Sequence, residues 1–273
     1  ESYAHYPIME AGLKFIRENR DNPFFCYFPI TPPHGMYDIP ANDPAWKLYE
    51  GEAWINDPAI PQDVKNYAAM VSMVDHNVGQ VLSLLRELKL EKDTIVFFTG
   101  DNGGQDRFRS PKHPRGFFGP NVNPKNGAEF RGGKGNLFEG GLRIPYLVRW
   151  PGKIKPRQVN DLIFYQPDVL PTLAELTGAK APDDIDGISF LPTLLGQAQT
   201  KKHEMLYWEF RGQTAVRQGL WKAIQTKPDR PWELYDLSQD ISESTNVAAK
   251  HLERLAKMKA FAKASHEPVR AGK

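Results

Sequence analysis

Four residues of this 273-residue chain combine a chemically active side chain with a place in a turn or a glycine-rich segment: His34, Asp101, Asn102 and Lys134. Asp101 and Asn102 offer a carboxylate and an amide oxygen side by side, and both are hard donors of the kind that Ca²⁺ and Mg²⁺ prefer. Asn102 followed by glycine is also a strong turn signal, so an Asx turn that closes a strand explains the same residues. Taken alone, the pair favours the turn over a metal site.

His34 and Lys134 are candidates for proton transfer and anion binding. His34 follows two prolines, and the stiff turn could hold it as a general acid or base, although a single loop histidine more often has only a surface role. Lys134 lies in the segment Arg-Gly-Gly-Lys-Gly over 131–135, which is typical of an anion cradle with a cationic tip, or of a flexible basic turn. It is not a Walker A loop, because Ala128 and Gly135 stand where that motif requires Gly and Ser or Thr.

Three other features carry weaker signals. Cys26 lies within an aromatic run, which favours a buried structural thiol over a nucleophile. The acidic cluster over 183–187 does not fit an EF-hand loop, because Pro182 and Thr193 stand where that loop requires metal ligands. We interpret the cluster as a solvated turn and His113 as a surface residue.

The elements around the candidate residues predict one shared sheet edge. Apolar residues over 65–90 recur at spacings of three and four, which predicts a helix, and the apolar runs over 24–30 and 94–99 predict buried strands on either side of it. The right-handed crossover of such a βαβ unit places both strand ends at the same edge, where open α/β sheets bind ligands. We therefore expect the functional atoms of His34, Asp101, Asn102 and Lys134 within about 10 Å of one another.

The remaining segments predict an α/β fold with a second, smaller part. Before residue 197 we expect helices and one further strand, over 5–19, 144–148, 167–177 and 188–195. After it, short strand-like segments indicate an antiparallel meander, over 206–210, 214–217, 220–224 and 232–237, followed by a helix from about 247. The predicted domains are thus a mostly parallel, helix-flanked sheet over 1–197 and a small antiparallel α+β subdomain over 198–273.

Composition excludes several classes of protein. Lys and Arg total 35 and Asp and Glu total 33, so a formal charge of +2 gives no electrostatic case for nucleic acid. The sequence contains no run of 18 apolar residues, so it predicts no membrane-spanning helix. The single cysteine excludes an intrachain disulfide. The chain starts at Glu1 without an initiator methionine, and we expect it to be a piece of a longer polypeptide.

Together, two metal-type oxygens, a proton donor and a lysine suit the cleavage of an anionic ester assisted by a divalent ion. With these residues in place, the sequence resembles the sulfatase family of the alkaline-phosphatase superfamily, from about residue 20 to 250. The resemblance rests on the helix from Tyr67 to Leu85 and on six segments: Pro23–His34, Ile95–Gly104, Arg131–Ile154, Asp168–Ala179, Asp186–Gly196 and Trp232–Asn246.

The resemblance implies an alkaline-phosphatase-like fold and a role for each candidate. Asp101 and Asn102 would be ligands of a Ca²⁺ ion, and His34 would contact the sulfate and protonate the leaving oxygen. Lys134 would bind a sulfate oxygen and the bridging oxygen, and 137–143 would pack the loop that carries it. The substrate would be a sulfated carbohydrate or an aryl sulfate, and the enzyme would be periplasmic or secreted.

One departure from the family pattern is large. Sulfatases carry an acidic metal-binding pair and a Cys/Ser-x-Pro-x-Arg motif whose first residue is oxidised to formylglycine, and neither occurs here; the residues after Cys26 do not fit. The resemblance is therefore to the C-terminal half only, with the formylglycine outside this chain. Two alternatives remain: a phosphatase or phosphodiesterase of the same superfamily, and a non-catalytic fragment that binds anionic glycans. The segment after Asn102 lacks the Asp-His pair of the two-metal enzymes, which favours a sulfatase.

Overall fold

The structure, a computed structural model, describes residues 3–105 and 109–268. It divides into two compact units, one of residues 1–96 with 150–153 and one of residues 97–149 with 154–273. Within the described ranges, no helix is both long enough and apolar enough to span a bilayer.

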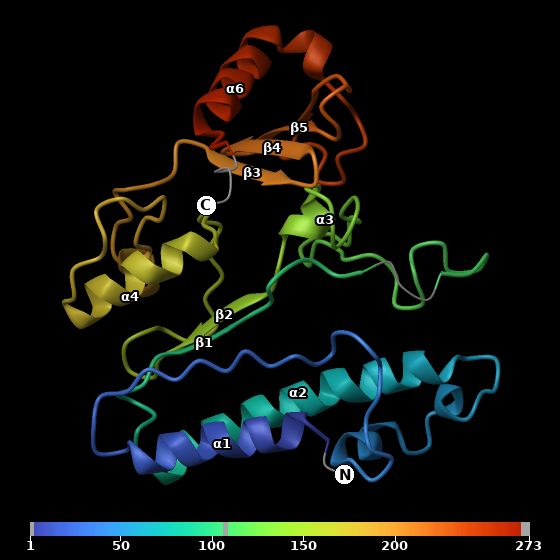
Figure 1. Cartoon of the computed structure of the whole chain (residues 1–273), viewed down its shortest axis with the longest axis vertical. Coiled ribbons are helices and arrows are strands. Elements are labelled where there is room, and N and C mark those ends of the chain that lie inside the picture. The colour runs from blue at the N-terminus through green and yellow to red at the C-terminus, as the bar shows by residue number, and fades with distance from the viewer. Residues whose placement is uncertain (1–2, 106–108, 269–273) are drawn as a thin grey trace. The chain divides into compact units, whose positions relative to one another are not determined.

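The first unit is built on two helices that the apolar spacing predicted. They are α1 (His5–Glu18) and α2 (Gln62–Glu87), which lie alongside each other in Figure 1, with short 3₁₀ turns at Pro44–Tyr49 and Ala53–Ile55. Ile16 of α1 packs against Leu84 and Leu85 of α2, and all three side chains are buried. The amphipathic faces of the two helices therefore form the core of this unit.

The predicted strand over 24–30 is wrong. The described segment has no strand pairing, and its side chains alternate between a packed face and an exposed one. Phe24, Cys26 and Phe28 pack on the core of α1 and α2, whereas Phe25 and Tyr27 are 72% and 75% exposed. The apolar run is thus an extended segment with one packed face, because a strand needs a hydrogen-bonded neighbour as well as apolar residues.

Before residue 197, the described part of the second unit has two strands, both predicted, and three short helices, of which the first was not predicted. The strands β1 (Val96–Thr99) and β2 (Tyr146–Arg149) form a two-stranded sheet. The helices are α3 (Glu139–Leu142), α4 (Val169–Thr177), which follows a 3₁₀ turn at Gln166–Asp168, and α5 (Leu191–Leu194). Helix α4 ends, as expected, at Gly178, whose φ of 72° is in the left-handed region.

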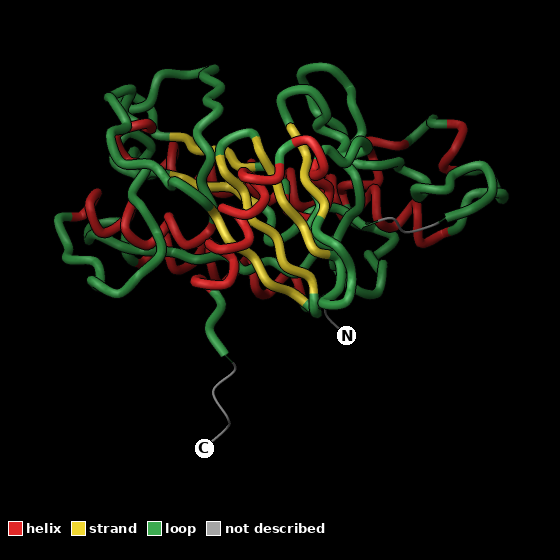
Figure 2. Tube along the Cα trace, turned by 90° about the horizontal axis from the view of Figure 1, so that it is seen from above, coloured by secondary structure: helices red, strands yellow, loops and turns green. Residues whose placement is uncertain are grey.

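The C-terminal meander is confirmed. Its strands β3 (Leu206–Phe210), β4 (Gln213–Gln218), β5 (Trp221–Gln225) and β6 (Glu233–Asp236) pair antiparallel in chain order. Helix α6 (Leu252–Ser265) crosses one face of this sheet, as Figure 2 shows, and Met258 packs there against Val216 and Leu234. In a second hydrophobic cluster, Ala215, Ile224 and Tyr235 pack with Leu137 and Phe138, which directly precede α3. The predicted boundary near residue 197 stays a prediction.

Candidate active site

Asp101 and Asn102 lie just past the end of β1, after Gly100, as predicted. Asp101 is exposed and Asn102 is half-buried, and neither side chain makes a hydrogen bond or an ion pair with another described residue. An Asx turn would use one of these oxygens, because the side chain then accepts a backbone N–H two residues on. The two oxygens therefore stay available to a ligand.

The lysine loop, residues 131–136, is hydrogen-bonded to the segment that carries these oxygens. The backbone N–H of Lys134 donates to the Gly104 carbonyl at 2.7 Å, and Gly103 N–H donates to the Gly141 carbonyl at 3.0 Å. The Lys134 side chain is exposed and makes no hydrogen bond or ion pair with any described residue. Three of the four predicted site residues thus lie on two adjoining loops of one unit.

Glycines allow the two loops and α3 to approach this closely. A Cβ atom added to Gly103 would lie 1.9 Å from the Gly140 carbonyl oxygen, and one added to Gly140 would lie 2.2 Å from the Gly132 carbonyl oxygen. Both distances are far below any contact that a real Cβ makes, so only glycine fits at these positions. The packing of the lysine loop by residues 137–143 is therefore confirmed.

His34 lies in the first unit, in the turn after Pro32 and Pro33. Its backbone N–H donates to the Thr31 carbonyl at 3.0 Å, and its side chain is exposed. The imidazole makes no hydrogen bond with any described residue. Its convergence with Asp101, Asn102 and Lys134 stays a prediction.

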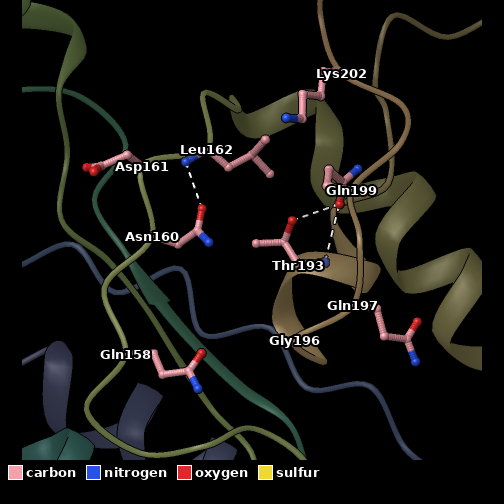
Figure 3. A pocket seen from close by; sticks show the side chains of 9 residues that line it. All are labelled: Gln158, Asn160, Asp161, Leu162, Thr193, Gly196, Gln197, Gln199 and Lys202. Carbon is pink, nitrogen blue, oxygen red and sulfur yellow. Dashed lines mark hydrogen bonds between the residues drawn. The ribbon is translucent and has the colours of Figure 1, made fainter.

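A polar cavity of about 460 Å³ lies elsewhere in the second unit, lined by the side chains in Figure 3. Part of its polar surface is satisfied internally, since Asn160 Oδ1 accepts from Leu162 N and Gln199 Oε1 accepts from Thr193 Oγ1, both at 2.8 Å. None of the four predicted site residues lines it. We therefore do not assign it to the candidate active site.

Comparison with known proteins identifies the family. The sulfatase family model matches residues 5–179, and the model of the C-terminal region of N-sulphoglucosamine sulphohydrolase matches residues 133–265. The chain belongs to the sulfatase family.

Its relatives are longer sulfatases. Steryl-sulfatase of Mus musculus is 35% identical over 227 residues, which cover 81% of this chain and 33% of the relative. N-acetylgalactosamine-6-O-sulfatase of Bacteroides thetaiotaomicron is 29% identical over 266 residues, which cover 90% of this chain and 48% of the relative. A solved structure described with glycosaminoglycan metabolism by that bacterium has a TM-score of 0.74 at 27% identity, covering 95% of this chain and 54% of that one.

These comparisons confirm the expected fold. The chain has the α/β architecture of the C-terminal part of a sulfatase, with the small antiparallel sheet at its end. It spans 33% to 48% of the length of the two curated relatives above.

The calcium ion that the sulfatase family implies fits the donors of this chain in part. The unpaired oxygens of Asp101 and Asn102 are the ligand type that Ca²⁺ prefers. Ca²⁺ takes six to eight oxygens, and no group of three or more His, Cys, Asp or Glu side chains gathers among the described residues. Among the described residues, the predicted ligands Asp101 and Asn102 thus bring a single negative charge.

Sequence reasoning missed one feature of the site. Helix α3, which packs on the lysine loop, contacts the antiparallel sheet through a buried charged cluster of Glu139, Lys222 and Glu243. The only local sign of this cluster in the sequence was Glu139, which stands directly before two glycines and close to the lysine loop.

Proposed function

We propose that this chain is the C-terminal part of a sulfuric ester hydrolase that acts on a sulfated carbohydrate or an aryl sulfate. The observation that carries the proposal is the 2.7 Å hydrogen bond from Lys134 N to Gly104 O. It keeps the lysine loop next to the segment of Asp101 and Asn102, and the side chains of all three residues have no partner among the described residues. A bound anion would use the Lys134 ammonium, and a metal cation beside it would use the oxygens of Asp101 and Asn102.

Each residue then has a distinct role. The Lys134 ammonium neutralises charge on a sulfate oxygen and on the bridging oxygen as the S–O bond breaks. Asp101 and Asn102 contribute oxygens to a Ca²⁺ ion, which when bound would polarise the sulfate. His34 donates a proton to the leaving alcohol oxygen.

None of these residues can attack sulfur and later release it. We assign that step to a formylglycine in a segment outside this chain, so the 273-residue chain alone should be inactive. Its Ca²⁺ affinity should also be weak, because affinity rises with ligand charge and Asp101 supplies one charge. The bacterial relatives are consistent with an exported enzyme, periplasmic or secreted.

The test compares the 273-residue chain with a longer polypeptide that contains it together with a Cys/Ser-x-Pro-x-Arg segment. With an aryl sulfate and Ca²⁺, we expect turnover by the longer protein only, and loss of turnover on chelation. Lys134→Ala should lower kcat about 100- to 1,000-fold, as the loss of one transition-state donor does. Lys257→Ala is the matched control, because Lys257 pairs with Glu204 on an exposed surface.

Two other results would overturn the proposal. Faster hydrolysis of a phosphate ester than of the sulfate ester would make the protein a phosphatase or phosphodiesterase. Binding of sulfated glycans without any turnover by the longer protein would make it a non-catalytic binding protein.

A further inference from the structure

A buried charged cluster joins α3 to the antiparallel sheet. Lys222, the second residue of β5, places its ammonium 3.0 Å from Glu139 Oε1 and 2.9 Å from Glu243 Oε1. The backbone N–H of Glu139 donates to Glu243 Oε2 at 2.6 Å. The side chains of Glu139, Lys222 and Glu243 are at most 1% exposed.

Two arginines complete the surroundings of Glu139. Arg143 Nε and Arg217 Nη1 donate to Glu139 Oε2 at 2.6 and 3.0 Å. Burial alone would raise the pKa of Glu139, but the charges of Lys222, Arg217 and Arg143 outweigh it, and the pKa lies below its ordinary value. Glu139 is therefore charged at neutral pH, and its two carboxylate oxygens bond residues of α3's C-cap, β4 and β5.

The lysine loop has its own bond to the same sheet. Arg131, three residues before Lys134, donates from Nη1 to Tyr235 Oη at 2.8 Å and to the Glu243 carbonyl at 2.9 Å. Its guanidinium also lies 3.9 Å from the centre of the Phe138 ring. The start of the loop thus contacts β6, the start of α3 contacts β4 and β5 of the same sheet, and both bond Glu243.

Stability alone does not explain this cluster. A buried ion pair is often no more stabilising than apolar residues of the same volume, whereas its directional bonds fix one geometry. Helix α3 has only four residues, so it cannot hold its own position. Gly140 of α3 lies against Gly132 and donates to the Arg131 carbonyl at 2.8 Å, so the lysine loop follows wherever α3 is held.

We propose that Glu139 and Lys222 are positioning residues for Lys134: their buried ion pair fixes α3 on the antiparallel sheet, and α3 fixes the lysine loop beside Asp101 and Asn102. The C-terminal sheet is then a support of the active site, although it contributes none of the residues assigned to catalysis. This inference rests on the proposed role of Lys134 in sulfate ester hydrolysis.

The first test measures amide hydrogen exchange on the 273-residue chain. In Glu139→Gln and Lys222→Met we expect the amides of Lys134 and Gly140 to exchange at least about tenfold faster, while protected amides of β4 and β5 change less. Equal acceleration of all these amides would show global destabilisation and overturn the inference, as would unchanged protection of Lys134. Lys257→Ala, which breaks an exposed pair of the same unit, should leave both sets unchanged.

The second test measures turnover in the longer polypeptide. Lys222→Met should lower kcat by about 10- to 100-fold, the effect of a displacement of about 1 Å in a catalytic group. If either cluster variant does not fold, Arg217→Gln replaces it, because Arg217 Nη1 donates to Glu139 Oε2 at 3.0 Å and its side chain is 11% exposed. Arg217→Gln should also accelerate exchange at Lys134, and unchanged exchange there would overturn the inference.

The two tests separate the inference from the proposed function. Suppose that the cluster variants show the expected amide exchange but the unmodified longer protein has no turnover. This result would support the coupling of the sheet to the lysine loop and refute the sulfatase proposal. Turnover by the unmodified protein, with Lys222→Met fully active, would refute the positioning role and keep the function.

Discussion

Gly140→Ala should destabilise the protein even though alanine is the better helix former. In a helix, alanine in place of glycine gains about 0.5–1 kcal/mol. At Gly140 the new Cβ would lie 2.2 Å from the Gly132 carbonyl oxygen and 2.7 Å from that of Arg131. These oxygens are backbone atoms and cannot rotate away, so the chain itself must move by nearly an ångström.

The size of the effect follows from three contributions. Overpacking of this kind costs about 1–3 kcal/mol, and weakening the bond from Gly140 N to Arg131 O costs roughly 0.5–1.5 kcal/mol more. The helix gain offsets part of this, which leaves a net loss of about 1–3 kcal/mol in the free energy of unfolding. Gly79→Ala is the matched control, because Gly79 lies within α2 and its added Cβ would have no atom within 4 Å.

Urea unfolding followed by far-UV circular dichroism provides the assay, with the slope m compared between variants. Gly79→Ala should raise the free energy of unfolding by about 0.4–1 kcal/mol, and Gly140→Ala should lower it. If Gly140→Ala is as stable as the unmodified chain at an equal m, the close packing of α3 on the lysine loop is not what we describe.

Two further predictions concern buried carboxylates of the second unit. Asp168→Ala should lower the free energy of unfolding in urea by about 2–4 kcal/mol, because Tyr165 N, Ile188 N and His203 Nε2 lie 3.0, 2.7 and 2.8 Å from the Asp168 carboxylate oxygens. Asp183→Ala is the control, because Asp183 is exposed, and it should lower that free energy by less than about 0.5 kcal/mol. Similar losses for both variants would contradict the prediction. Burial alone would raise the pKa of Glu139, but the charges of Lys222 and Arg217 outweigh burial, so the pKa lies below its ordinary value of about 4.3. The charged carboxylate therefore contributes its full stabilisation above that ordinary value, and this stabilisation is lost as the pH falls through the lowered pKa. The stability difference between the unmodified chain and Glu139→Gln, measured by urea unfolding from pH 7 to pH 3, should therefore be constant above about pH 5 and shrink below about pH 4; a difference that widens on acidification would refute the assignment.

The local elements could be predicted because their causes lie within a few residues. The spacing of apolar residues predicted α2, the apolar run before Gly100 predicted β1, and regularly spaced short segments predicted β3 to β6. Asp101, Asn102 and Lys134 were identified as candidates because their residue types and neighbouring glycines are visible in the sequence.

The tertiary structure decided what depends on distant partners. The run over 24–30 has the apolar residues of a strand but no hydrogen-bonded neighbour, and a sequence does not show whether that neighbour is present. Glu139, Lys222 and Glu243 are each unremarkable charged residues in the sequence. They form one buried cluster only in the folded chain. The pairing of β5 with β6 and the placement of α3 bring Glu139 within hydrogen-bond distance of Lys222, which is 83 positions away, and of Glu243, which is 104 positions away. Residue spacing along the chain determined which side chains could do the chemistry, whereas contacts between distant residues determined what holds Lys134 beside Asp101 and Asn102.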